Sequence, residues 1–264
     1  MPILEQLKPQ YERLFNSCEI RSTKLAEIDG IADRIIANKS RYESIGKPLK
    51  IPWFFIGITH CMECGLSFNK HLHNGDTLNG RTVQVPKGRP RTGNPPFSFD
   101  SSATDALVYE GFDKVTDWSI PGTLYLFEKY NGFGYRNRSI NIPSPYLWSY
   151  SNHYLKGKYG SDGKYDPNLV SKQCGTASIL RRLAEKQSIN FNDQQLNRIQ
   201  AIKAMDRLVR FLPNTINEDA RMLQSLLNEL GFPLLRDGKA GEKTSNAYKQ
   251  VSGKYLAGDT RRRE

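Results

Sequence analysis

The sequence "FFIGITHCMECGLSFNKHLHNGDTL" (residues 54–78) joins an unbroken apolar run to a cluster of polar, chemically active side chains. Pro52 suits the first turn of a helix and Gly65 suits its end, so we expect a helix that carries Glu63 in its last turn. A carboxyl group there lies near the negative end of the helix dipole and against apolar packing, and both raise its pKa. Glu63 is therefore predicted to donate a proton near neutral pH.

The sequence on either side of this stretch is predicted to be mainly helical. Apolar residues at three- and four-residue spacing indicate helices within 2–45, and further helices are expected at 101–112, 120–131 and 167–187. The alternating sequence "RTVQVP" (81–86) predicts a short strand. We therefore expect an α+β fold that is mainly helical, with a small β element.

A change of composition divides the chain into two predicted domains, residues 1–212 with a core at 50–187, and residues 213–264. The intervening residues 188–214 are polar and then basic, end near Pro213, and are interpreted as a connector. The N-terminus has no basic segment followed by an apolar core, and no apolar run reaches the roughly 18 residues that span a bilayer. We expect a protein made in the cytoplasm without a signal peptide and without a membrane span.

The formal net charge of +11 predicts an anionic partner, for which nucleic acid and an anionic cell wall are both candidates. The basic residues are spread along the chain and no known nucleic-acid-binding motif is present, so we expect no nucleic-acid partner. The ending "RRRE" (261–264) is interpreted as a solvated tail. The four cysteines are too few and too irregular for a disulfide scaffold, and Cys61 and Cys64, an isolated C-x-x-C, are interpreted as packing residues.

The C-terminal segment contains the order Leu-Gln-x-x-Leu-Asn-x-x-Gly-Phe, followed by Asp-Gly-x-x-Gly-x-x-Thr. This order resembles the small three-helix peptidoglycan-binding domain of many wall-degrading enzymes. The residues that carry the resemblance are Leu223, Gln224, Leu227, Asn228, Gly231, Phe232, Asp237, Gly238, Gly241 and Thr244. Independently, Asn217 predicts an N-cap, Gly238 and Gly241 permit tight turns, and Thr244 is suited to cap the following helix. The alternative is a helical hairpin that only dimerises or packs.

The sequence "IGITHCMECGLSF" (56–68) is similar to the catalytic helix of goose-type lysozymes and lytic transglycosylases, in which apolar residues precede Glu-Ser and then Phe. The segments 71–90 and 129–154 resemble lysozyme-like endolysins of phage and bacterial type that carry the same binding module. The resemblance implies a lysozyme-like catalytic domain in which Glu63 is the catalytic acid and Phe68 packs behind it. At position 64 a cysteine replaces the serine common in the family.

Cleavage of a glycosidic bond usually requires a second carboxylate. Asp76 is the nearest candidate, and Thr82, in the expected hairpin, is a weaker candidate for positioning water. Aromatic rings stack on sugar faces and amides bridge their hydroxyl and N-acetyl groups, so the candidate substrate-binding residues are His60, His73, Asn74, Tyr130, Asn131, Tyr135, Tyr146, Trp148 and Asn152.

The expected function is hydrolysis of peptidoglycan between N-acetylmuramic acid and N-acetylglucosamine, by a monomeric muramidase or lytic transglycosylase that requires no cofactor or metal. Such an enzyme would reach the wall after holin-type release, secretion or lysis. Two alternatives stay open. A zinc-dependent peptidase or amidase would use the cluster of His60, Glu63, His71 and His73, in which the spacing H-x-x-E is one helical turn. A non-catalytic wall-binding protein would need only the charge and the C-terminal domain.

Overall fold

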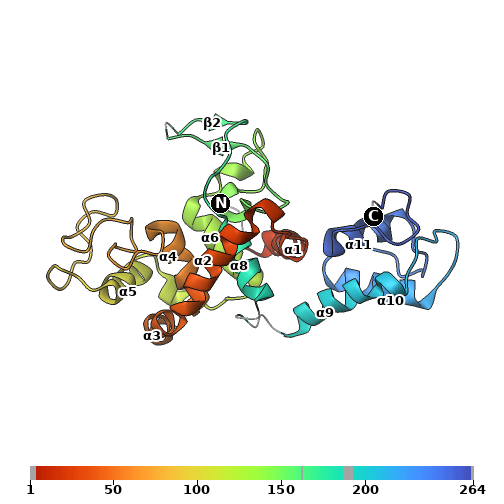
Figure 1. Ribbon diagram of the computed structural model, residues 1–264, viewed down its shortest axis with the longest axis horizontal. Coiled ribbons are helices and arrows are strands. Elements are labelled where there is room, and N and C mark those ends of the chain that lie inside the picture. The colour runs from red at the N-terminus through yellow and green to blue at the C-terminus, as the bar shows by residue number, and fades with distance from the viewer. Residues whose placement is uncertain (1–3, 162, 187–188, 190–192, 263–264) are drawn as a thin grey trace.

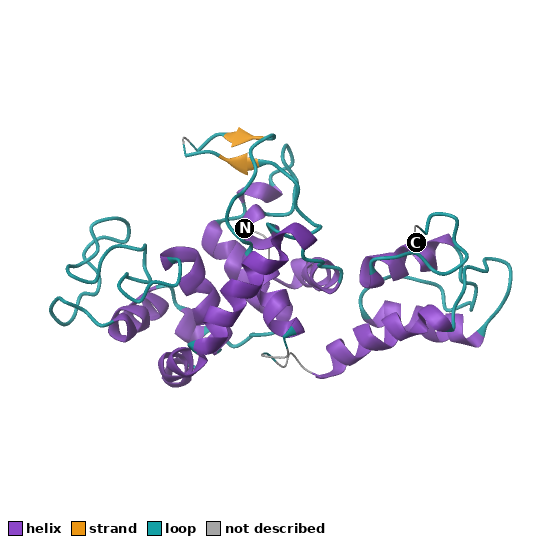
Figure 2. Cartoon of the chain, viewed as in Figure 1, coloured by secondary structure: helices purple, strands orange, loops and turns teal. Residues whose placement is uncertain are grey.

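The computed structural model describes residues 4–161, 163–186, 189 and 193–262. This part of the chain is mainly helical, with a single two-stranded sheet. Figures 1 and 2 show a larger N-terminal part, from which a long irregular loop and the small sheet project, and a smaller C-terminal part reached through α9 (Asp193–Ala204). The expectation of a mainly helical fold with a small β element is confirmed.

The N-terminal part contains helices α1 (Leu4–Asn16), α2 (Leu25–Ala37), α3 (Lys39–Leu49), α4 (Trp53–Cys64), α5 (Phe99–Tyr109), α6 (Ile120–Asn131), α7 (Pro145–Trp148) and α8 (Thr176–Glu185). Strands β1 (Lys158–Tyr159) and β2 (Tyr165–Asp166) pair antiparallel, with Lys158 opposite Asp166. The helices expected at 101–112 and 120–131 are confirmed as α5 and α6. The helix expected from residue 167 begins only at Thr176.

Helix α4 lies at the centre of the first hydrophobic core, because it packs against α2, α3 and α8 and its residues 54–60 are all buried. A Cβ atom at Gly57 would lie 2.6 Å from Cγ2 of Ile35 and 3.1 Å from a ring carbon of Tyr42. Glycine therefore lets the three helices approach closely, which offsets its poor helix propensity. Gly65 ends α4 in the left-handed conformation, with φ of 59°, as expected.

Residues 81–86 form no strand, so this expectation is wrong. Val83 and Val85 are 70% and 87% exposed, and the alternation therefore has no buried face to pack against a core. The amides of Val83 and Gln84 donate to Oδ2 of Asp76 instead of to a neighbouring strand. The β element lies in β1 and β2, and the segment between α4 and α5 is an irregular loop in which no hairpin of named strands forms among the described residues.

The C-terminal part has its own hydrophobic core between α9, α10 (Glu218–Glu229) and α11 (Glu242–Ser252). Four buried residues before the expected domain boundary belong to this core: Ile199, Ile202, Met205 and Val209. The interpretation of 188–214 as a connector is therefore wrong for residues 199–209, because these four side chains belong to the same core as those of α10 and α11. A boundary at 212/213 stays a prediction. Residues 187–188 and 190–192 lie outside the described chain.

The motif residues of the C-terminal part form one hydrogen-bond cluster. Asn217 caps α10 by accepting from two amides of the first turn, as expected. Thr244 lies inside α11 and does not cap it; its hydroxyl accepts from Nε2 of Gln224 at 3.3 Å. Oε1 of Gln224 accepts from the Gly238 amide at 2.9 Å, and Nε2 donates to Asp237 at 2.8 Å. The glutamine therefore holds the Asp-Gly turn against the two helices.

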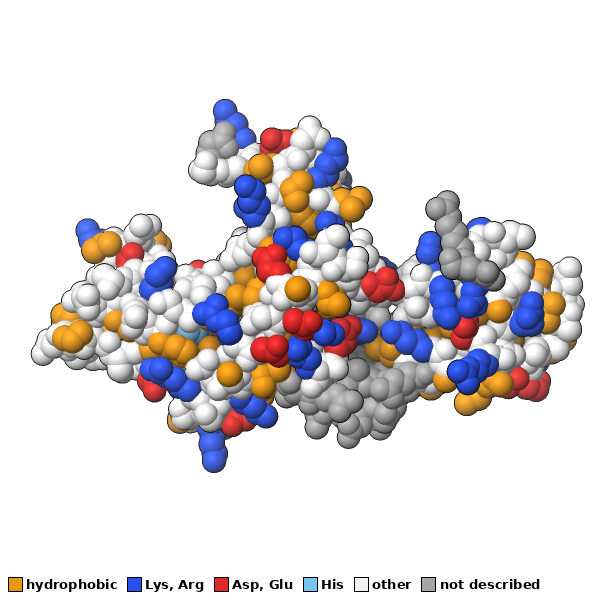
Figure 3. Space-filling view, viewed as in Figure 1, with side chains coloured by type: hydrophobic (Ala, Val, Ile, Leu, Met, Phe, Trp, Pro, Cys, Tyr) orange, Lys and Arg blue, Asp and Glu red, His pale blue; other side chains and the backbone are white. Residues whose placement is uncertain are grey.

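Two general expectations concern the surface. Within the described residues, no helix has the length and apolarity needed to cross a membrane. Lys and Arg side chains are spread over both parts of the face seen in Figure 3, as the sequence indicates.

Candidate active site

Glu63 lies in the last turn of α4 and is partly buried, so its carboxyl group is near solvent without being fully hydrated. Burial raises the pKa of Glu63 to about 7, and the negative charge of Glu110 adds to this increase. A hydrogen bond from Tyr146 opposes it. The carboxyl group is thus balanced between its protonated and ionised forms at neutral pH, which is the property expected of a general acid.

One tyrosine is hydrogen-bonded to the Glu63 carboxyl group, and the charge of this group also acts on a second. The hydroxyl of Tyr146, from α7, donates to Oε1 of Glu63 at 3.3 Å. Burial and the charge of Glu63 raise the pKa of both Tyr146 and Tyr130, the latter near the end of α6. Both phenols therefore stay protonated. The structure thus places two residues selected as candidate substrate-binding groups, Tyr130 and Tyr146, near the candidate catalytic acid.

The loop after α4 rests on the backbone of Glu63. Gly75 adopts φ of 79°, and a Cβ atom on it would lie 2.7 Å from the Glu63 carbonyl oxygen, so only glycine permits this approach. The next residue, Asp76, accepts three hydrogen bonds at Oδ2, from the amides of Val83 (2.8 Å) and Gln84 (3.1 Å) and from Nδ2 of Asn74 (3.1 Å). These bonds, led by that of Gln84, lower the pKa of Asp76.

Glu63 and Asp76 therefore have environments that move their pKa values in opposite directions. The first is favoured in its protonated form by burial, and the second is kept ionised by backbone amides. In many hydrolytic sites, such a difference in pKa distinguishes the carboxyl group that acts as the acid from the one that acts as the base.

Both hydrogen bonds of the Thr82 hydroxyl are made within the loop. It is buried, its hydroxyl donates to the Pro86 carbonyl, and the same oxygen accepts from the Arg89 amide at 2.9 Å. The expected role in positioning water is not supported by this geometry, because no hairpin presents Thr82 and both hydrogen-bonding functions of its hydroxyl are in use.

The histidines point to different partners. His60 is completely buried between Phe68 and Phe99, its Nδ1 lies 2.9 Å from the Tyr42 hydroxyl, and burial lowers its pKa to about 4. His60 therefore cannot contact a substrate, and Phe68 packs on His60. His71 is also buried and is bonded through its two nitrogens to Ser102 and to the Gly80 carbonyl, each at 2.7 Å.

His73 is buried and contacts a half-buried ion pair. Its Nε2 lies 2.8 Å from Asp105, and the same carboxylate accepts two hydrogen bonds from Arg89, at 2.7 and 2.9 Å. This cluster ties the loop to α5. Within the described residues, no group of three or more His, Cys, Asp or Glu is placed to hold a metal ion. The arrangement that the zinc-peptidase alternative requires is therefore not formed.

The remaining candidates are divided between the site and other regions. Asn131 is exposed at the end of α6, beside Tyr130. Trp148 is 1% exposed and belongs to the core, which leaves it no surface for stacking on a sugar. Tyr135 is buried, and its hydroxyl accepts from the amide of Tyr159. Asn152 uses its side-chain amide to bond the backbone of Ser17 and Glu19, at the end of α1.

Sequence reasoning missed Glu110, which follows α5, and the clamp formed by Arg89 and Asp105. It also missed Gln173, whose Nε2 donates to the carbonyl of Met62 at 3.1 Å, one residue before Glu63. No local pattern marks any of these residues, because each acts on a partner far away in the sequence.

Cys64 donates from Sγ to the His71 carbonyl at 3.3 Å and is not in a disulfide.

Comparison with known proteins gives no relative. No model of a protein family matches the chain, and neither the curated proteins nor the solved structures contain a match. The function is therefore argued from the residues and their geometry.

Proposed function

We propose that this protein cleaves the glycan backbone of peptidoglycan between N-acetylmuramic acid and N-acetylglucosamine, with Glu63 as general acid. The observation that carries the proposal is the partly buried Glu63 carboxyl group at the end of an apolar helix, with a pKa raised to about 7. A carboxyl group that is still about half protonated at neutral pH can transfer its proton to a glycosidic oxygen as the bond to the anomeric carbon breaks.

Asp76 is the proposed partner of Glu63. Its three donors converge on Oδ2, which keeps the carboxylate ionised and fixed, and its loop rests on the Glu63 backbone through Gly75. In hydrolysis, an ionised carboxylate takes a proton from the attacking water or stabilises the positive charge at the anomeric carbon. In the lytic transglycosylase route, a hydroxyl of the same sugar attacks instead, and Glu63 alone can give and recover the proton.

Three side chains are proposed to bind the sugar, of which Asn131 is exposed and Tyr130 and Asn74 are half-buried. These residues lie on segments that contribute to the region of Glu63. Tyr146 holds the carboxyl group by its hydroxyl. The C-terminal part is proposed to bind the wall, with the net charge of +11 favouring an anionic surface.

The test is digestion of purified peptidoglycan by the full chain, followed by mass spectrometry of the released fragments. New reducing ends on N-acetylmuramic acid indicate hydrolysis, and 1,6-anhydro sugars indicate transglycosylation. Both outcomes support glycan cleavage. Release of free peptides with intact glycan strands, abolished by a chelator and restored by zinc, would overturn the proposal in favour of a metallopeptidase.

A further inference from the structure

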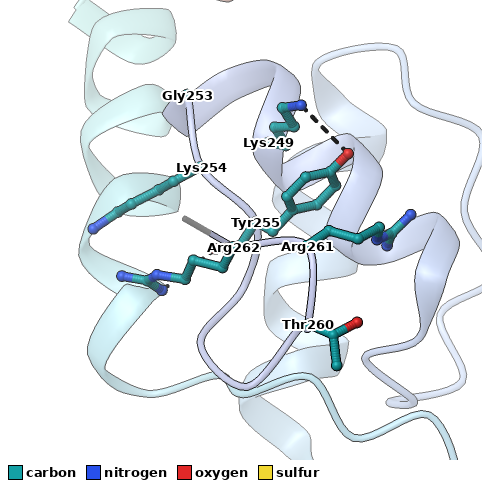
Figure 4. Close-up of a pocket in the computed structure, with 7 residues that line it drawn as sticks. All are labelled: Lys249, Gly253, Lys254, Tyr255, Thr260, Arg261 and Arg262. Atoms are coloured by element: carbon teal, nitrogen blue, oxygen red, sulfur yellow. Dashed lines mark hydrogen bonds between the residues drawn. The ribbon is translucent and has the colours of Figure 1, made fainter. Parts of the chain in front are cut away.

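A separate pocket of about 640 Å³ lies in the C-terminal part of the chain (Figure 4). It is lined by four cationic side chains, Lys249, Lys254, Arg261 and Arg262, together with Tyr255 and Thr260. Lys249 comes from α11, and the others come from the segment that follows this helix. Among the described residues, none that lines the pocket is acidic. A concave surface with this lining attracts a ligand of negative charge.

Carboxylates that are not among the lining residues hold three of the four cations in place, and Glu242 is one of them, paired with Arg261 at 2.9 Å. Asp206 accepts from Lys254 at 2.6 Å and from both terminal nitrogens of Arg262 at 2.8 and 3.1 Å. Asp259, which is buried, accepts from Nε and Nη2 of Arg261 at 3.0 and 2.8 Å. The interpretation of the chain end as a solvated tail is therefore wrong for its first two arginines, and the last two residues lie outside the described chain.

The two lysines retain donors for a ligand. An ammonium group has three N–H donors. Lys249 has one described hydrogen-bond partner, the Tyr255 hydroxyl at 3.3 Å, and Lys254 has one, Asp206. The guanidinium donors of the two arginines, in contrast, are mostly directed at carboxylates and at backbone or amide oxygens. The lysines are thus the groups that can bond directly to an anion. The arginines contribute to the shape of the pocket and to its positive charge.

The tyrosine ring indicates which polyanion suits the pocket. Nζ of Lys249 lies 4.4 Å from the ring centroid of Tyr255, and Cζ of Arg261 lies 4.5 Å from it. Single-stranded nucleic acids are bound by stacking their bases on aromatic faces. Here Tyr255, the one aromatic residue in the lining that the structure describes, already has two cations next to its ring. A chain of phosphates without bases therefore fits better than DNA or RNA.

We propose that this pocket binds a linear phosphodiester chain without bases, with Lys249 and Lys254 as the direct phosphate contacts. Two sources present this chemistry, namely a soluble polyol-phosphate polymer of a cell wall and the phosphodiester headgroups of a lipid surface. The pocket does not include Glu63, so this proposal can be tested independently of the proposed glycan cleavage.

The experiment measures binding of synthetic glycerol-phosphate oligomers to the full chain by calorimetry at several salt concentrations. The double variant Lys249→Gln/Lys254→Gln should bind at least tenfold more weakly. Two lost phosphate contacts should also reduce the slope of log K against log salt by about 1.4. Lys249→Arg/Lys254→Arg, which keeps the charges, should retain most of the affinity. Lys47→Gln/Lys50→Gln removes two exposed charges from the N-terminal part and should bind like the unmodified protein.

Three outcomes would overturn the proposal. The first is unchanged affinity in the double glutamine variant whose thermal unfolding matches that of the unmodified protein. The second is equally tight binding of single-stranded DNA through the same two lysines, which would assign the pocket to nucleic acid. The third is binding to phosphatidylglycerol vesicles without any binding to the oligomers. Binding to the oligomers but not to the vesicles supports the proposal and identifies a wall polymer as the ligand. Binding to both the oligomers and the vesicles also supports it and shows that the pocket recognises the phosphodiester group that they share.

Discussion

The hydroxyl of Tyr146 lies 3.3 Å from Oε1 of Glu63, a residue 83 positions earlier in the chain, and donates a hydrogen bond to it. This bond lowers the pKa of Glu63, whereas burial raises the same pKa by more, and the balance lies at about 7. The bond also limits the orientations of the carboxyl group. Tyr146 is therefore proposed to position and tune the acid.

The variant Tyr146→Phe tests this role. Loss of the hydrogen bond should raise the pKa of Glu63 further, so the alkaline limb of the pH profile of kcat/KM should move to higher pH. Loss of orientation should lower kcat at the optimum by roughly tenfold. Tyr135→Phe is a matched control, because its hydroxyl bonds to the amide of Tyr159. An alkaline limb that stays in place would contradict the tuning role.

Glu63 should also make stability depend on pH. Its pKa rises from an ordinary 4.5 to about 7 on folding, so the unfolded chain loses this proton first as the pH increases. The contribution of Glu63 to the free energy of unfolding is therefore fully present below pH 4.5 and is lost as the pH rises from 4.5 to 7. With allowance for partial exposure, Glu63→Gln should be more stable than the unmodified protein by about 2 kcal/mol at pH 8.

Urea unfolding of both proteins at pH 8 and at pH 4 measures this difference. The two unfolding free energies should converge at the acidic pH, where the carboxyl group is protonated in both states. A glutamine variant that is less stable than the unmodified protein at pH 8 would contradict the raised pKa.

Asp76→Asn tests the second carboxylate. The substitution removes the ionised group but leaves one oxygen to accept from the loop amides, so we expect hydrolysis to fall by about 10²-fold or more. The measurement is the rate of appearance of reducing ends, with thermal unfolding as a control for the loop. A folded variant with an unchanged rate would exclude Asp76 from the chemistry and favour the route that uses Glu63 alone.

Asp105→Asn tests the clamp that holds the loop. The variant loses the paired bonds to Arg89 and weakens the contact with His73, which should cost about 1–3 kcal/mol. Limited proteolysis should then cut the loop between α4 and α5 faster. The control is Asp100→Asn, because Asp100 forms a more exposed ion pair with Arg41 and should contribute less than about 1 kcal/mol. Equal proteolysis of the two variants would contradict the clamp.

The local sequence predicted the helix that carries Glu63, because its apolar run, its preceding proline and its terminal glycine lie next to one another. It also predicted the cap of α10 by Asn217. These features depend on neighbours within one or two turns. The strand expected at 81–86 failed because the amides of that segment bond to Asp76 and its two valines face solvent.

The site was only partly predictable for the same reason. The three histidines near Glu63 suggested a shared metal in the sequence, but their partners are Tyr42, Ser102 and Asp105. These partners lie 18 to 32 residues away, and no periodic pattern reveals them. The contact of Tyr146 with Glu63 likewise arises from packing between distant helices.

The most direct test of the central claim is the release of soluble fragments from purified peptidoglycan by Glu63→Gln. We expect the rate to fall by about 10²–10⁴-fold relative to the unmodified protein, because glutamine cannot donate the proton. The variant should still pellet with peptidoglycan, and Glu43→Gln, which changes an exposed carboxylate on α3, should keep full activity. Full release of fragments by Glu63→Gln would contradict the assignment of Glu63 as the catalytic acid.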